Sequence, residues 1–352
     1  MTIDSIPSGP IDAPSAWVGE DLAKTPKVWL TALDEAEITE LETAAKAYLA
    51  TGRDIGQITQ ADFPLPVLGG RLQGLRETLT SGRGFEVLRG LPVDRYDQET
   101  AATIFCGLGA HLGSVCSQNA AGHTLGHVRD VGADATDPNT RIYQTHERQT
   151  FHTDSADVVG LLCLREAQSG GESLLVSTAT VFNTMLMVRP DLVPLLFEPI
   201  ATDRRGEVPE GCNPWFDIPV LSWFEGHLTG MYQRQYIESA QRFPEAPRLT
   251  PKHIETLNLF DATANHPRNV IRMRLQPGDI QFVHNHALMH DRTNFVDWPD
   301  PARRRHLLRL WLSVPGDRPL PDVFAQRFGS TAIGDRGGIF VPGTTQNAPI
   351  DN

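Results

Sequence analysis

The sequence predicts an α+β fold in which a double-sheet jelly roll, or double-stranded β-helix, is flanked by helices. Helical periodicity is confined to the first third of the chain and to two later inserts, whereas the rest shows short apolar runs separated by turn residues. Strands and helices do not alternate, and this disfavours a parallel βαβ sheet.

Helices dominate the first third of the chain. Residues 1–30 are rich in Pro, Ser and Asp and show no period, so we expect an extended arm. A helix is then predicted from Asp34, which forms a capping box with Glu37, to a terminator at Gly52. Further helices are predicted over residues 65–79, 100–112, 178–197 and 251–265.

Strands are predicted wherever short apolar runs lie between turn residues. These runs cover residues 85–88, 158–164, 173–176, 217–222, 270–275, 280–283 and 307–314. The sequence contains no internal repeat and no low-complexity segment that would mark a boundary. We therefore expect residues 31–352 to form a single domain.

Composition excludes several classes of partner. The 31 Lys and Arg against 43 Asp and Glu give a net charge of −12, without a long basic tract, so nucleic acid is not an expected partner. No apolar run reaches the roughly 18 residues of a membrane span, and the start lacks signal-peptide features, so a soluble, cytoplasmic protein is expected. Four cysteines without CxxC spacing predict neither a zinc finger nor disulfides, but small buried residues.

Two histidine-containing segments are candidates for a metal site. His152 and Asp154 stand two residues apart, so on an extended strand both would face the same side. Far downstream, His284, His286 and His290 crowd the end of a predicted strand. Two histidines and one carboxylate form the facial triad of non-haem iron oxygenases, although zinc accepts the same ligands.

A pair of arginines forms the third element. Arg305 and Arg309 lie in or beside the apolar run 307–314, where a guanidinium needs an anion to offset its burial. A planar guanidinium can hold a carboxylate through two hydrogen bonds. For Arg309, a structural carboxylate of the protein is the alternative partner.

Together these segments resemble the TauD/TfdA family of Fe(II)- and 2-oxoglutarate-dependent dioxygenases, the taurine dioxygenase-like and clavaminate synthase-like enzymes. The resemblance runs from the strand at Phe85 to about Leu312. The His152 motif precedes a Gly-Gly-acid-Ser/Thr element, here residues 170–173, and His290 is followed by x-Arg-x-x-Phe.

The resemblance implies a role for each matching residue. His152, Asp154 and His290 would hold the iron, with His286 as the less favoured third ligand. Arg305 would grip the distal carboxylate of 2-oxoglutarate. The resemblance further places Ser173 as a hydroxyl donor to that carboxylate, and Arg309 on either the same carboxylate or an anionic group of the substrate.

The implied activity is hydroxylation of an unactivated C–H bond with release of succinate and carbon dioxide. Dioxygen is the oxidant, and the substrate would be small and anionic or derived from an amino acid. Desaturation and cyclisation stay open as outcomes, and the resemblance allows a homo-oligomer. Asn119 and Gln144 are further candidates for contact with the substrate.

Two other functions use the same residues. One is a metal-binding jelly-roll sensor, or a non-catalytic relative, that binds a ligand without oxidising it. The other is a zinc- or manganese-dependent hydrolase or isomerase. The pairing of Arg305 with Ser173 argues for the oxygenase, because neither alternative needs an anion clamp near the metal.

Overall fold

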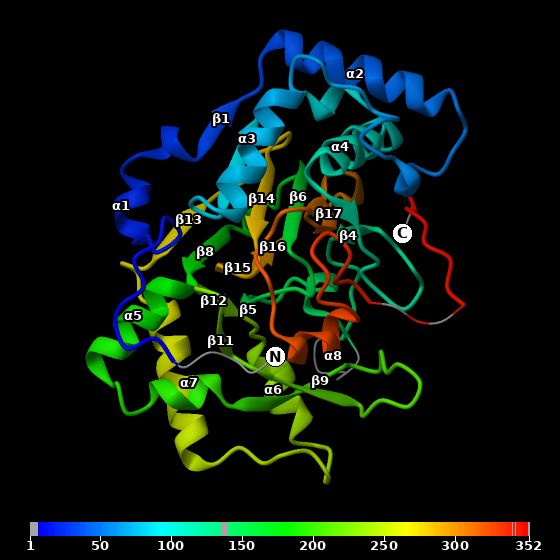
Figure 1. Cartoon of the computed structure of the whole chain (residues 1–352). Helices are drawn as coiled ribbons and strands as arrows, with labels where there is room; N and C mark the ends of the chain where they lie inside the picture. Colours follow the sequence, from blue (N-terminus) through cyan, green and yellow to red (C-terminus); the bar gives the residue numbers. More distant parts are fainter. Residues whose placement is uncertain (1–5, 135–139, 340, 342, 351–352) are drawn as a thin grey trace.

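Two β-sheets packed face to face occupy the centre of the molecule (Figure 1). The computed structural model describes residues 6–134, 140–339, 341 and 343–350. The major sheet has the order β1-β2-β14-β6-β17-β3, and β4 also pairs with β17. Its strands are β1 (Leu30–Ala32), β2 (Phe85–Arg89), β3 (Ser114–Val115), β4 (Leu125–Val128), β6 (Val158–Arg165), β14 (Ile280–His284) and β17 (His306–Ser313).

The minor sheet has the order β13-β8-β15-β5 and is antiparallel throughout. It is built from β5 (Gln149–His152), β8 (Ser173–Ser177), β13 (Val270–Met273) and β15 (Leu288–Arg292). Three two-stranded ribbons complete the β structure. They are β7 (Ser169–Gly170) with β16 (Phe295–Val296), β9 (Pro199–Asp203) with β10 (Trp215–Pro219), and β11 (Leu221–Phe224) with β12 (His227–Gly230).

Helices cover the outer faces of both sheets (Figure 1). On the major sheet lie α2 (Glu35–Leu49), α3 (Gly69–Thr80) and α4 (Gln98–Leu112), which share one hydrophobic core with its strands. On the minor sheet lie α5 (Thr178–Val188) and α7 (Pro251–Ala264), with a core of their own. The short helices are α1 (Gly19–Ala23), α6 (Arg234–Ala240) and α8 (Ala325–Phe328). The fold is therefore α+β, as predicted.

Alternation along the strands decides which side chains enter the space between the sheets. On β17, Leu308, Leu310 and Leu312 pack into the helical core of the major sheet. The intervening positions, among them Arg309, therefore face the minor sheet. On β15, Met289 packs toward α5, so His290 faces the opposite way.

Most of the predicted elements are present, with two corrections. The capping box at Asp34 is confirmed, since its side chain accepts from the Glu37 N–H and Glu37 accepts from the Asp34 N–H. The helix predicted over 178–197 ends at Val188, because Pro190 disfavours helical geometry at the residue before it. The strand predicted over 217–222 is two strands, β10 and β11, which separate at Val220.

The N-terminal segment is held against the body. Its described part includes α1, and Ile11 both donates to and accepts from the side-chain amide of Asn183 on α5. Residues 1–5 of the predicted arm lie outside the described residues, and the division into an arm and one domain stays a prediction. Among the described helices, none is both long and apolar enough to cross a bilayer. All four cysteines are free, and Cys212 is exposed, so the expectation of burial is wrong for that residue.

A buried ionic network fastens the C-terminal segment to the end of β14. The Arg336 guanidinium binds Asp157 through Nε at 2.7 Å and Asp317 through Nη2 at 3.0 Å. His284 and His286 contact Asp317 and Asp157 at 2.9 and 2.8 Å. The side chains of Arg336 and both aspartates have no exposed surface, so each charge depends on its partners for solvation.

We expect Arg336→Leu to lower the free energy of unfolding by about 3–5 kcal/mol, because it leaves two buried carboxylates without their cation. Denaturant unfolding measures this loss. Arg53→Leu serves as the comparison, since it removes a pair with Asp62 whose arginine side chain is 43% exposed, and it should change stability far less. Equal losses in the two variants would contradict the role assigned to the network.

Candidate metal centre

His152 and His290 face each other across two paired strands. His152 ends β5, and His290 lies directly opposite it on β15 in antiparallel register. Their ring centroids are 4.1 Å apart. Burial is the main reason why the pKa of His152 falls to about 3, and the neighbouring His290 lowers it further. His152 is therefore held in the neutral form that can ligate a metal.

Asp154 follows the end of β5 and is held by three neighbours. Its backbone N–H donates to the side-chain oxygen of Asn285 at 3.2 Å. The carboxylate accepts from Trp311 Nε1 at 2.9 Å and lies 3.5 Å from Arg309 Nη1. Burial alone would raise the pKa of Asp154, but Arg309 and His290 outweigh it and hold that pKa below the usual range. The carboxyl group is thus ionised.

These three side chains fit one divalent cation. Their potential ligand atoms all lie within 4.8 Å of one another, with Asp154 oxygens 3.9 Å from His152 Nε2 and 3.7 Å from His290 Nε2. His152 Nδ1 lies 2.8 Å from the Thr150 carbonyl oxygen, so it carries the proton and Nε2 carries the lone pair. The Gln149 amide donates to that lone pair at 2.8 Å. Two imidazoles and one carboxylate are the donor set of a non-haem iron site.

A cavity between the two sheets, here called the sheet cavity, extends from the two histidines to Arg305. Its lining includes His152, Ser173, His290 and Arg305, together with apolar residues of β6 and β17. Arg305 is 5% exposed, and its buried Nη1 has no hydrogen-bond partner among the described residues. Burial lowers the pKa of Arg305 to about 10, which leaves the guanidinium charged at neutral pH. A buried, charged and unpaired donor indicates an anion-binding position.

Neighbouring residues shape this anion position. Ser173 on β8 also lines the sheet cavity, and its hydroxyl donates to Gln281 Oε1 at 2.9 Å, so it would have to turn from Gln281 to donate to an anion. At Gly171, where φ is +73°, a Cβ would lie 3.0 Å from Arg305 Nε. A larger residue at 171 would therefore crowd the guanidinium.

Sequence reasoning missed Arg292 as a site residue. It is 7% exposed, lines the sheet cavity, and has a buried Nε without a partner among the described residues. Burial, and then the charge of Arg305, lower the pKa of Arg292 to about 9. The signal was present in the sequence, because Arg292 stands two residues after His290 and alternation on β15 turns both to the same face.

Arg309 is more fully bonded than Arg305. Besides Asp154, it donates through Nε to Gln118 at 2.7 Å, and its guanidinium lies 4.6 Å from the Tyr143 ring centroid. It lines both the sheet cavity and a second cavity, here called the loop cavity, which is bounded by Tyr143, Asp154, β9, β10, α6 and α8. Arg309 therefore orients the carboxylate of Asp154, which agrees with the alternative that its partner is a carboxylate of the protein.

The two residues expected to contact the substrate lie outside both cavities. The side chain of Asn119 closes a turn by accepting from the Ala121 and His123 N–H groups. Gln144 is not among the residues that line either cavity. Their neighbours Gln118 and Tyr143 contact Arg309 instead.

A second group of acids and histidine has metal-like spacing but carries its own cation. Asp157, His286 and Asp317 also bring ligand atoms within 4.8 Å of one another. Arg336 already binds both carboxylates, so the group is a salt-bridged network. This places His286 on Asp157, away from His152 and Asp154, and leaves His290 as the histidine opposite His152.

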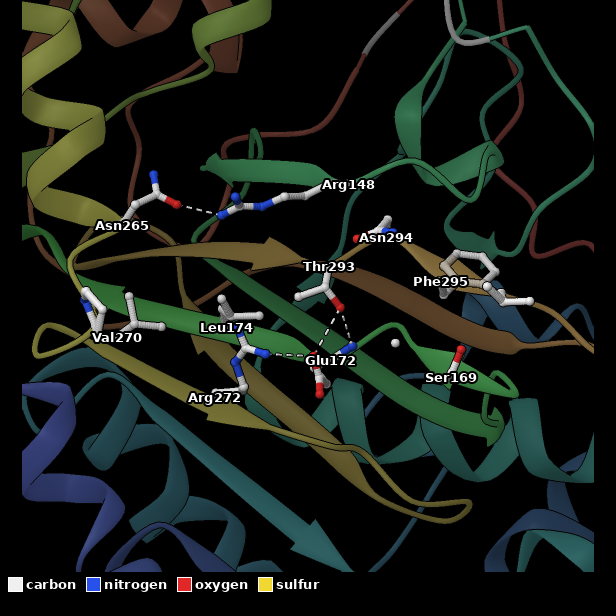
Figure 2. Close-up of a pocket in the computed structure, with 13 residues that line it drawn as sticks. Arg148, Ser169, Glu172, Leu174, Asn265, Val270, Arg272, Thr293, Asn294 and Phe295 are labelled. Atoms are coloured by element: carbon white, nitrogen blue, oxygen red, sulfur yellow. Dashed lines mark hydrogen bonds and ion pairs between the residues drawn. The ribbon is translucent and has the colours of Figure 1, made fainter.

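A broad surface cleft lies on the outer side of the minor sheet, and its charged groups bond within the cleft or to adjacent strands. Figure 2 shows the contacts of Arg272 with Glu172 and of Arg148 with Asn265. Arg148 also pairs with Asp291 at 2.5 Å. None of the three candidate metal ligands lines this cleft, and the sheet cavity is the better candidate site.

Comparison with known proteins agrees with this geometry. The model of the family described as "Taurine catabolism dioxygenase TauD, TfdA family" matches residues 47–311. FR-33289 synthase of Streptomyces rubellomurinus is 31% identical over 330 residues, which cover 92% of this chain and 96% of that protein. The taurine hydroxylase-like protein SAT17 of Stachybotrys chartarum is 29% identical over 311 residues, or 86% and 80% of the two chains.

The fold also matches solved structures. Asparagine oxygenase, solved with Fe(II), hydroxyasparagine and succinate, superposes with a TM-score of 0.62 at 20% identity, over 81% of this chain and 93% of that one. This likeness shows the shared fold, and the family match covers both histidine segments and both arginines. The chain therefore belongs to the TauD/TfdA family of dioxygenases, non-haem iron enzymes that use 2-oxoglutarate.

Proposed function

We propose that this enzyme hydroxylates an unactivated C–H bond of a small anionic or amino-acid-derived substrate, with release of succinate and carbon dioxide. One observation carries the proposal. The sheet cavity is lined both by the two histidines that face Asp154 and by the buried guanidinium of Arg305, whose Nη1 has no hydrogen-bond partner in the described part of the chain, so a metal position and an anion position share one space.

In this proposal His152, Asp154 and His290 hold the iron. When bound there, the iron would supply the oxidising chemistry, and these three side chains would hold it in place. Arg305 and Ser173 hold the distal carboxylate of 2-oxoglutarate and thereby orient the molecule along the sheet cavity. Arg292 adds positive charge to the same cavity, which favours a dianionic co-substrate.

Neighbouring side chains hold the Asp154 carboxylate in one orientation, in which it can bind a cation. Trp311 and Arg309 fix the carboxylate, so it loses little freedom when the metal binds. Apolar residues Val159, Leu161 and Leu307 line the sheet cavity and limit water near the reacting groups. The protein thus supplies position, charge and a partly dry environment.

Two facing sheets, antiparallel except for the β1–β2 pair, with helices outside them support a double-stranded β-helix. We also propose a cytoplasmic enzyme with a single small-molecule substrate and no nucleic-acid or membrane partner. The Nη1 of Arg305, which has no hydrogen-bond partner among the residues that the structure describes, disfavours the sensor and the hydrolase, since neither requires an anion beside the metal.

Succinate formation tests the proposed reaction. The enzyme is incubated with Fe(II), 2-oxoglutarate and dioxygen, with and without pools of small carboxylates, sulfonates and amino acids. We expect succinate in amounts that depend on iron and dioxygen and that rise with the correct pool. Ligand binding without succinate would support the sensor instead, and a hydrolysed or isomerised product formed without dioxygen would support the metal-dependent hydrolase or isomerase.

A further inference from the structure

The lining of the loop cavity carries more positive charge than is needed to pair with Asp154. Its charged lining residues are Asp154, at the metal site, and three arginines, Arg141, Arg309 and Arg327. Arg309 is committed to Asp154 and to Gln118. The metal site therefore does not account for the presence of Arg141 and Arg327 in this lining.

Among the described residues, one carboxylate contacts both of these arginines. Glu207, on the connection between β9 and β10, pairs with Arg141 through Oε2, and the same oxygen lies 3.9 Å from Arg327 Nη2. Arg205 and Gly206 both have positive φ, 57° and 80°, and this tight turn directs Glu207 toward the two guanidinium groups. Both guanidinium groups thus contact the same carboxylate oxygen.

All three charges are shielded from water. The side chains of Arg141, Arg327 and Glu207 are 14%, 8% and 11% exposed. Burial, together with repulsion from Arg141, lowers the pKa of Arg327 to about 10, while Glu207 counteracts both. Burial alone would also lower the pKa of Arg141, but Tyr236 and Glu207 outweigh it and raise that pKa. A further anion between the two guanidinium groups would therefore chiefly offset the burial of Arg327.

Other groups tie this position to the metal site. Arg327 Nε donates to Ser155 Oγ at 2.7 Å, and Ser155 directly follows Asp154 in the chain. Gln233 also lines the loop cavity, and its buried Oε1 has no hydrogen-bond partner among the described residues. A ligand in this cavity would thus meet a cation pair and a free acceptor beside the candidate metal ligand.

We propose that Arg141 and Arg327 bind an oxyanion group of the primary substrate, a carboxylate, sulfonate or phosphonate, and that Glu207 occupies this position when substrate is absent. Gln233 then accepts a hydrogen bond from a donor elsewhere on the substrate. The inference rests on the proposed function, since it assigns the bound molecule as the one oxidised at the metal. It is distinct from the 2-oxoglutarate position at Arg305, which lies in the sheet cavity.

The test uses full-length enzyme loaded with Fe(II) and 2-oxoglutarate under anaerobic conditions. Acetate, methanesulfonate and methylphosphonate are titrated by calorimetry, and their relative affinities distinguish the three oxyanions. At least one should bind. Arg327→Gln and Arg141→Gln should each weaken its binding by about tenfold or more, because each removes a charge-assisted hydrogen bond. Glu207→Gln should strengthen it by about fivefold or more, because it removes the competing charge.

Arg272→Gln is the matched control, since Arg272 pairs with Glu172 in the cleft of Figure 2, away from the loop cavity. It should leave oxyanion binding unchanged. Glu207→Gln retains the size and polarity of the side chain, so its predicted gain tests the proposal even if an arginine variant fails to fold. Unchanged binding in Glu207→Gln, or an equal loss in Arg272→Gln and Arg327→Gln, would overturn the proposal.

The visible absorbance band of the iron complex with 2-oxoglutarate distinguishes a failure of the proposed function from a failure of the oxyanion site. The Arg141, Arg327 and Glu207 variants should keep the band of the wild-type enzyme. A missing band in wild type would refute the proposed function, whereas a normal band with no binding of any of the three oxyanions to wild type or Glu207→Gln would refute only the oxyanion site.

Discussion

Asp154→Ala lowers the affinity for Fe(II) by more than about 100-fold and abolishes succinate formation. Loss of an outer-shell partner of a metal ligand already costs roughly 10–100-fold, so loss of a ligand should exceed that range. The variant also leaves the positive charge of Arg309 without its carboxylate, which further opposes a cation at this position. Equilibrium dialysis of Fe(II) and a succinate assay measure the two effects.

An aspartate on the surface provides the comparison for this variant. Asp191 pairs with Arg189 in an exposed position, and Asp191→Ala should keep wild-type iron affinity and turnover. Full activity in Asp154→Ala would show that Asp154 is not a ligand of the metal. The assignment of His152 and His290 as partners of that carboxylate would then be wrong as well.

Arg305→Gln raises the dissociation constant for 2-oxoglutarate on the order of 100-fold while Fe(II) still binds. Truncating one partner of a buried charge pair costs about 2–5 kcal/mol, and every 1.4 kcal/mol is about tenfold. Arg305 lines the sheet cavity, and its Nη1 has no hydrogen-bond partner among the described residues, so the variant removes the charge that would meet the distal carboxylate. Calorimetric titration of the iron-loaded enzyme measures the change.

Arg303, two positions before Arg305 in the chain, provides the control for the Arg305→Gln variant. It is exposed and stacks on Trp298, with 3.7 Å between the guanidinium carbon and the ring centroid. Arg303→Gln should leave the affinity for 2-oxoglutarate at the wild-type value. If Arg305→Gln also leaves it unchanged, the clamp is built from other residues, and Arg292 becomes the first to test.

Periodic features of the sequence predicted the structure most reliably. The capping box at Asp34 and the apolar runs of β6, β14 and β17 depend on local chemistry and regular spacing, and the structure contains all of them. Alternation on β17 turns three leucines toward the helices, which is why Arg309 faces the site. The family resemblance is confirmed, together with the enzyme class and its use of iron and 2-oxoglutarate.

Long-range contacts could not be predicted in the same way. Arg327 reaches Ser155 across 172 positions, and Arg336 reaches Asp157 across 179, without a local pattern that marks either arginine. In the segment around Asn119, a turn reverses the chain, so the neighbouring Gln118 contacts Arg309. Loop residues lack the periodicity that assigns strand residues to a face.

The central claim is that one cavity holds iron and 2-oxoglutarate together, and anaerobic titration tests it most directly. Metal-free enzyme receives Fe(II) and then 2-oxoglutarate while visible absorbance is recorded. We predict a weak charge-transfer band that appears only after both additions and is absent from His152→Ala. Iron binding without this band in the wild-type enzyme would contradict the account.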